Sequence, residues 1–120
     1  MADLHVLDAE TAQLIEGVCD AIVPGSARVK PAVYIDAQLA RMDEGMRAGT
    51  IEHFRAMAGA NFAEHLHNPV FLHVRAMAIE AFYSDFVAPG AAADGAWSEI
   101  DFNSPLATRL AKDWSYLGIA

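Results

Sequence analysis

Helical spacing of apolar residues, without any stretch of strand-like alternation, is the feature that most constrains the fold of this chain. The clearest helix start is Asn68, whose side chain can cap a helix, followed by Pro69 at a position where a missing N–H costs nothing. From Val70 to Phe82 apolar residues recur at helical spacing, so one face of this helix must be buried. After Tyr83 the period ends among Ser, Asp, Pro, Gly and Ala residues. The sequence therefore predicts an all-α fold interrupted by a long irregular connection.

Two helices are expected in the first third of the chain. Asp8 can cap the first helix, which runs to about Val23 and ends at a Pro-Gly pair. The second helix begins at Pro31, and its apolar stripe continues to Met46. We expect the charged residues along this second segment mostly to face water: Asp36, Arg41, Asp43, Glu44 and Arg47.

A third and a last helix complete the prediction. The Gly-Thr pair at 49–50 breaks the second stripe, and its threonine can cap a third helix that continues to Leu66, with a kink or split at Gly59. The pair Ser104–Pro105 can begin a final helix that ends at Gly118. Before it, residues 100–102 are short enough and apolar enough to be extended. The expected fold is a small irregular domain of about five helices, residues 1–120, with an aromatic, Ala- and Gly-rich connection before the C-terminal helix.

Length and composition narrow the classes of function. A chain of 120 residues is one domain by length, and its 54% hydrophobic content is high enough to leave an apolar patch beyond its own core. Sixteen acidic residues against eight basic ones give a net charge of −8, which disfavours binding to nucleic acid or to anionic membranes. No apolar run is long enough to span a bilayer, and the first ten residues lack a basic signal region and a twin-arginine pair. A cytoplasmic location is therefore expected.

No catalytic motif stands out among the polar residues. The single cysteine, Cys19, lies in a helical stripe and is expected to be a small buried residue. There is no GxSxG elbow and no phosphate-binding loop. We therefore expect no catalytic, cofactor-binding or metal-binding residue in this chain.

Histidines supply the alternative hypothesis. His65 and His67 lie close together near Glu64, with His53 and His73 on flanking elements. Residues two apart on a helix point to different sides, so the first pair can share a metal only if the helix ends there, before the cap at position 68. A small helical metal-binding enzyme or sensor that uses His53, His65 and His67 is the resulting alternative.

Aromatic residues crowd the last third of the chain. Trp and Tyr are enriched at binding hot spots, because one end is apolar and the other forms hydrogen bonds. We expect about half of these aromatics to close the core of the domain and the remainder to face a partner. The candidate interface residues are Phe82, Tyr83, Phe86, Trp97, Phe102, Trp114 and Tyr116.

Several segments together resemble the gluconate 2-dehydrogenase subunit 3 family. They are LDAETAQLIEGVCDAIVPG, VYIDAQLA, FLHVRAMAIEAFYSD and the short GAW. Members of this family are small subunits of heteromeric flavin-dependent dehydrogenases of sugars and polyols, whose large subunit is a glucose-methanol-choline (GMC) oxidoreductase. The resemblance implies a chain that is not an enzyme by itself but binds and stabilises a large FAD-containing subunit, which carries the cofactor and the chemistry.

Two departures from the family pattern change what is expected. The better-known members carry a twin-arginine signal for export, which this sequence lacks, so an intracellular sugar or glycoside oxidoreductase complex is implied. The run before the tryptophan is APGAAADGAW in place of the usual Asn- and Gly-rich stretch, so the local contact is expected to differ. A third hypothesis is a self-associating helical module that binds an unrelated protein.

Overall fold

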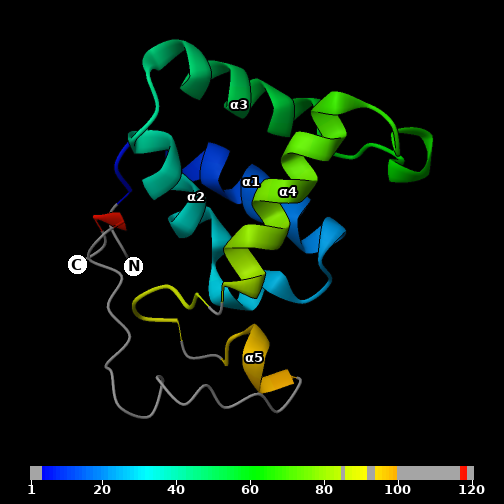
Figure 1. Ribbon diagram of the computed structural model, residues 1–120. Helices are drawn as coiled ribbons and strands as arrows, with labels where there is room; N and C mark the ends of the chain where they lie inside the picture. The colour runs from blue at the N-terminus through cyan, green and yellow to red at the C-terminus, as the bar shows by residue number, and fades with distance from the viewer. Residues whose placement is uncertain (1–3, 85, 92–93, 100–116, 119–120) are drawn as a thin grey trace.

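The computed structural model describes residues 4–84, 86–91, 94–99 and 117–118. Within them the chain is all-α, as predicted, with no strand (Figure 1). The α-helices are α1 (Ala9–Ile22), α2 (Pro31–Ala40), α3 (Glu44–Met57), α4 (Pro69–Tyr83) and the short α5 (Ala96–Glu99). Two 3-10 turns, η1 (Ser26–Val29) and η2 (Phe62–Glu64), connect them.

Two helix starts predicted from capping residues are confirmed. The Asp8 carboxylate accepts a hydrogen bond of 2.7 Å from the backbone N–H of Thr11 at the start of α1. The Asn68 side chain accepts one of 2.9 Å from Val70 N–H at the start of α4. Each cap satisfies a backbone donor that has no partner within its helix, so both starts are fixed by local chemistry.

The predicted boundary between the second and third helices is wrong. Helix α2 ends at Ala40, and α3 begins at Glu44, where the Asp43 side chain accepts a hydrogen bond from Met46 N–H at 2.9 Å. Thr50 therefore lies inside α3, where its hydroxyl donates to the Met46 carbonyl at 2.8 Å instead of capping a helix. The Asp43 carboxylate caps the helix at its first turn. A threonine hydroxyl can instead bond to the carbonyl four residues earlier within a helix, so Thr50 does not have to mark a helix start.

Arg47 joins the two helices across that boundary. Its guanidinium donates from Nε to the carbonyl of Leu39 at 3.0 Å and from a terminal nitrogen to the carbonyl of Met42 at 3.2 Å. Carbonyls at the end of a helix lack intrahelical partners, and a cation there also complements the helix dipole. A residue expected to face water thus holds the end of α2 against the start of α3.

The break predicted at Gly59 is confirmed, but the predicted continuation of the third helix to Leu66 is wrong. The helix stops at Met57, nine residues before the expected end at Leu66. Gly59 has φ = +73°, a left-handed conformation that terminates helices and that glycine adopts without strain. The chain then turns through η2 to reach the cap of α4.

Helix α4 contacts α1, α2 and α3, and Figure 1 shows it crossing the middle of the molecule. Most of its buried residues join those of α1, α2 and α3 and Leu117 in the main core, whereas Phe82 lies in a second, smaller cluster. Asp36, predicted to face water, is only 1% exposed. Its carboxylate accepts backbone hydrogen bonds from His5, Val6 and Leu7 at 2.6, 2.9 and 2.9 Å, so it ties the N-terminal segment to α2. A buried carboxylate is tolerated because these donors satisfy it.

The connection after α4 is anchored without regular structure. The Phe86 ring is buried edge-on against Tyr34, with centroids 5.3 Å apart. Ala88 N–H donates to the carbonyl of Val29 at 3.0 Å, and Arg28 Nε donates to the carbonyl of Asp94 at 3.2 Å. This segment ends in α5, which periodicity did not predict.

Other predictions lie beyond these elements. The final helix expected to begin at Ser104–Pro105 and the extended run at 100–102 fall outside the described residues, apart from the last residues at 117–118. In the part of the chain that the structure describes, no helix is long and apolar enough to cross a bilayer.

Candidate functional site

Helix α4 is apolar on two opposite sides. Its inner side is buried in the core through Phe71, Val74, Ala78, Ala81 and Phe82. On the other side lies a second apolar series, Leu72, Ala76, Ile79 and Tyr83, which we term the α4 outer row. Spacings of four, three and four residues place these side chains within about 60° around the helix axis. The outer row is therefore a narrow stripe along most of α4.

The outer row is largely open to solvent. The side chains of Leu72 and Tyr83 are 45% and 55% exposed, Ala76 is exposed, and Ile79 is half-buried. The exposed residues Arg75 and Glu80 lie on either side of the row. A helix that is apolar all round is usually buried on every side, whereas α4 is covered by its own chain on one side only.

Trp97 extends the outer row at its C-terminal end. Its indole Nε1 donates to the backbone carbonyl of Tyr83, the last residue of α4, at 3.1 Å. The half-buried indole also packs, with Ile79, against a small cluster that includes Val29 and Phe82. Helix α5 thus places an aromatic side chain beside Tyr83 with its N–H already bonded.

The structure separates the interface residues predicted from sequence. Phe82 and Phe86 are 1% and 0% exposed, so in this fold their side chains close the core and do not reach the surface. Tyr83 and Trp97 lie together at the surface. Phe102, Trp114 and Tyr116 lie outside the described residues.

Sequence reasoning missed the remaining members of the outer row. None of Leu72, Ala76 and Ile79 is aromatic, so the crowding of aromatic residues did not point to them. The signal was present in the 72–76–79–83 spacing, which repeats at the helical period beside the stripe assigned to the core.

The histidines pair differently from the alternative hypothesis. His53 of α3 and His73 of α4 approach with their Nδ1 atoms 2.9 Å apart and their ring planes 89° to one another. His65 instead contacts the side chain of Asn68, Nδ1 to Nδ2, at 3.1 Å. Across the described ranges, no group of three or more His, Cys, Asp or Glu side chains comes together around a possible ion.

Burial governs the electrostatics of the histidine pair. Removal from water lowers the pKa of His73, and the charge on His53 adds to this effect. A lowered histidine pKa favours the neutral ring, which can accept a hydrogen bond or act as a ligand at neutral pH.

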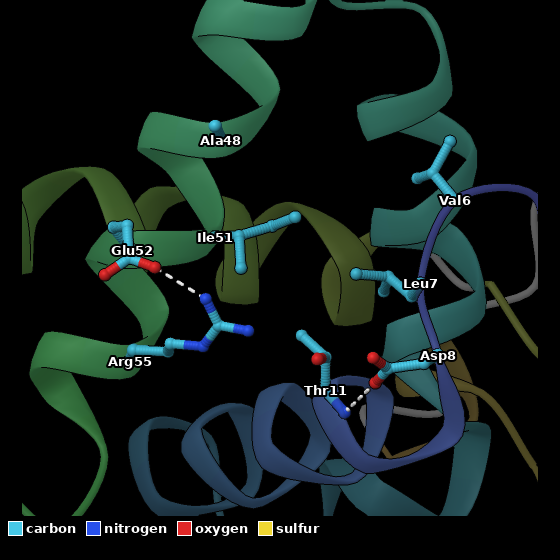
Figure 2. Close-up of a pocket in the computed structure, with 8 residues that line it drawn as sticks. All are labelled: Val6, Leu7, Asp8, Thr11, Ala48, Ile51, Glu52 and Arg55. Atoms are coloured by element: carbon cyan, nitrogen blue, oxygen red, sulfur yellow. Dashed lines mark hydrogen bonds and ion pairs between the residues drawn. The ribbon is translucent and has the colours of Figure 1, made fainter.

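A pocket of about 250 Å³ lies between the N-terminal segment, the start of α1 and α3 (Figure 2). Its charged groups are already engaged: Glu52 pairs with Arg55, and Asp8 caps α1 through the backbone N–H of Thr11. The bond from Thr11 also lowers the pKa of Asp8, so this carboxyl is ionised at neutral pH and is no general acid. The pocket offers no acid–base pair for catalysis.

Cys19 is buried in the core, as predicted. Burial raises the pKa of its thiol to about 12, with the carboxylates of Glu16 and Asp20 adding to the effect. Because the thiolate is the reactive form, this cysteine is not a nucleophile at neutral pH.

Comparison with known proteins adds no relative. No family model matches the chain, and no match was found among curated proteins or solved structures. The two features that offer a contact surface or a ligand set are the α4 outer row with Trp97 and the histidine pair.

Proposed function

We propose that this chain is the non-catalytic small subunit of an intracellular heteromeric dehydrogenase of sugars, polyols or glycosides. In this proposal it binds and stabilises a large GMC-type flavoprotein subunit, which carries FAD and the chemistry. The segments that resemble small subunits of that class supply the partner's identity. The α4 outer row with Trp97 supplies the contact surface.

The observation that carries the proposal is the exposed apolar side of α4. Tyr and Trp are among the side chains that most often dominate the binding free energy of protein interfaces, and the Trp97 indole is held at the Tyr83 backbone. Arg75 and Glu80 flank the row, as expected of a polar rim around an apolar centre. Ala76 leaves room for a partner side chain between Leu72 and Tyr83.

Pre-organisation of Trp97 favours its use as an anchor. The bond to the Tyr83 carbonyl and the packing against the cluster that includes Phe82 hold the indole in place before any partner binds. Ordering a flexible side chain on binding costs roughly 0.5–1.5 kcal/mol, and a side chain that is already ordered avoids much of that cost.

Co-expression with a GMC-type large subunit from the same genome tests the proposal. We expect both chains to co-elute in size-exclusion chromatography as one species with flavin absorbance. Separate elution of two well-folded proteins would contradict it. A stable homo-oligomer that does not bind the flavoprotein would favour the hypothesis of a self-associating helical module instead.

Trp97→Ala tests the anchor. We expect it to weaken assembly by on the order of 2 kcal/mol, about 30-fold in Kd, because the indole is proposed as an aromatic anchor of the interface. Binding is measured by titrating the flavoprotein with the variant, after circular dichroism has shown an unchanged helical spectrum.

A matched pair of leucines controls for loss of apolar surface in general. Leu72 lies in the outer row and Leu66 lies before α4, and both are exposed. Leu72→Ala should weaken binding, whereas Leu66→Ala should leave Kd unchanged. Equal effects of the two substitutions would remove the outer row from the interface.

A further inference from the structure

The His53–His73 pair joins two different helices at close range. His53 comes from α3 and His73 from α4, and these helices pack directly against each other. Both rings are half-buried, so packing restricts them while an edge remains open to solvent. Two nitrogens held on separate rigid helices are pre-positioned in a way that two histidines on a mobile loop are not.

The distance between His53 Nδ1 and His73 Nδ1 can be compared with the spacing of two ligands around one metal ion. Imidazole nitrogens bind first-row metals at about 2.0–2.1 Å, so two ligands at 90° around one ion lie about 2.8–3.0 Å apart. Two ligands of a tetrahedral ion lie farther apart, about 3.3–3.4 Å. The observed separation of 2.9 Å between His53 Nδ1 and His73 Nδ1 is that of a hydrogen bond in the metal-free pair, and it also lies within reach of two adjacent ligands of a square-planar or tetragonal ion.

We infer that His53 and His73 form a two-nitrogen chelating site for a divalent late transition metal of tetragonal preference, Cu(II) or Ni(II). Nitrogen ligands in this geometry favour these ions, and Cu(II) binds most tightly in the series of divalent first-row metals. Within the described residues no third His, Cys, Asp or Glu joins this pair, so water would complete the coordination sphere. The site is independent of the proposed role as a small subunit.

Protonation of the rings is compatible with binding. In the metal-free pair, one Nδ1 carries a hydrogen that it donates to the lone pair of the other. To chelate a metal, the donor ring shifts its proton from Nδ1 to Nε2 through solvent, and both rings turn so that their Nδ1 lone pairs, which lie along the N···N line in the hydrogen-bonded pair, converge on the ion. No net proton release is required when both rings are neutral.

The chelate would act as a clamp between α3 and α4. A ligand that binds only the folded state stabilises it in proportion to the logarithm of ligand concentration over Kd. Both histidines are brought together only when α3 and α4 are packed, so metal binding should raise Tm. The net charge of −8 further favours a divalent cation over an anion.

The test uses the tag-free full chain, stripped with chelator and titrated with Cu(II) or Ni(II). We expect one ion per chain, a Tm that rises with metal concentration, and an electron paramagnetic resonance spectrum of the Cu(II) form that shows two nitrogen ligands. His53→Gln and His73→Gln should each abolish the metal-dependent rise in Tm. The control His65→Gln/His67→Gln should retain it.

Other outcomes overturn the inference. Equal metal-dependent Tm shifts in the wild type and His53→Gln would mean that the pair does not chelate. A lowered Tm in His53→Gln, with no response of the wild type to metal, would mean that the pair only forms a hydrogen bond. If a variant fails to fold, line broadening by Cu(II) in wild-type NMR spectra decides the question, because it must centre on the two rings.

Discussion

The inner and outer sides of α4 carry similar residues but differ in what covers them. Phe82 and Tyr83 are neighbours in sequence with rings in edge contact, centroids 5.1 Å apart, yet their exposed fractions are 1% and 55%. One ring packs into the core while the other stands at the surface beside Trp97. Position around the helix, and not side-chain chemistry, therefore divides residues that hold this fold together from residues available to a partner.

This division predicts different consequences for the same kind of substitution. Truncating the inner side creates a cavity and lowers the free energy of unfolding. Truncating an exposed side chain of the outer row removes few contacts within the isolated chain, so it should change assembly and leave the free energy of unfolding nearly unchanged.

The largest expected contrast is in thiol reactivity. Cys19 lies in the core that the inner side of α4 joins, and a pKa of about 12 in place of 9.0 lowers its thiolate fraction at neutral pH by about 1,000-fold. Ala76→Cys, made with Cys19→Ala, places a thiol on the outer row. We expect this thiol to react rapidly with a disulfide reagent while native Cys19 reacts only after denaturant is added. Equal reaction rates of the two thiols in the folded protein would contradict the difference in exposure between the inner and outer sides of α4.

Phe82→Ala should have the largest effect on stability. The ring is buried and also lies under the Arg28 guanidinium, 5.0 Å from the ring centroid. We expect a loss of about 3–5 kcal/mol of unfolding free energy, typical of truncating a buried aromatic. Urea denaturation followed by circular dichroism measures it. A loss below about 1 kcal/mol would show that this side is loosely packed.

Asn68→Ala should have an intermediate effect, because the cap supports the whole helix and not one side. Its side-chain oxygen satisfies the backbone N–H of Val70, and loss of such a cap costs about 1 kcal/mol. Asn68→Asp keeps an acceptor and serves as the control. If both variants lose stability equally, contact of the Asn68 amide with His65 matters more than the cap.

Tyr83→Ala should change stability least, by no more than about 0.5 kcal/mol, because more than half of the side chain is exposed. Its backbone carbonyl, which accepts the Trp97 bond, is retained in the variant. Urea denaturation of Tyr83→Ala and Phe82→Ala under the same conditions compares their free energies of unfolding directly. A loss comparable to that of Phe82→Ala would place Tyr83 in the core.

Local chemistry made part of the fold predictable. Asp8 and Asn68 cap their helices through residues two or three positions away, so the sequence alone identified both starts. The helix start predicted at Thr50 was wrong because a threonine hydroxyl can either cap a helix or bond to a carbonyl within it. Asp43 supplied the cap of α3 instead. Competition between nearby caps cannot be judged from one residue at a time.

Contacts between distant residues were beyond the sequence pattern. Asp36 resembles any solvated helix carboxylate, but its partners are backbone N–H groups about 30 positions earlier in the chain. His53 and His73 are 20 residues apart and meet only because α3 packs on α4. Likewise, the surplus of aromatics was visible in sequence, but which of them faces outward depends on tertiary packing: Phe82 and Tyr83 differ in their position around α4, and Phe86 is buried against Tyr34 of α2.

Thiol protection at position 76 tests the central claim most directly. The variant Ala76→Cys with Cys19→Ala is labelled alone and after mixing with the flavoprotein large subunit, and the complex is isolated by size exclusion. If the α4 outer row is the contact surface, labelling at position 76 should fall sharply in the complex and recover when Trp97→Ala weakens assembly and the protein concentration is below the variant's Kd. An isolated complex whose thiol at position 76 reacts as fast as in the free chain would contradict the account.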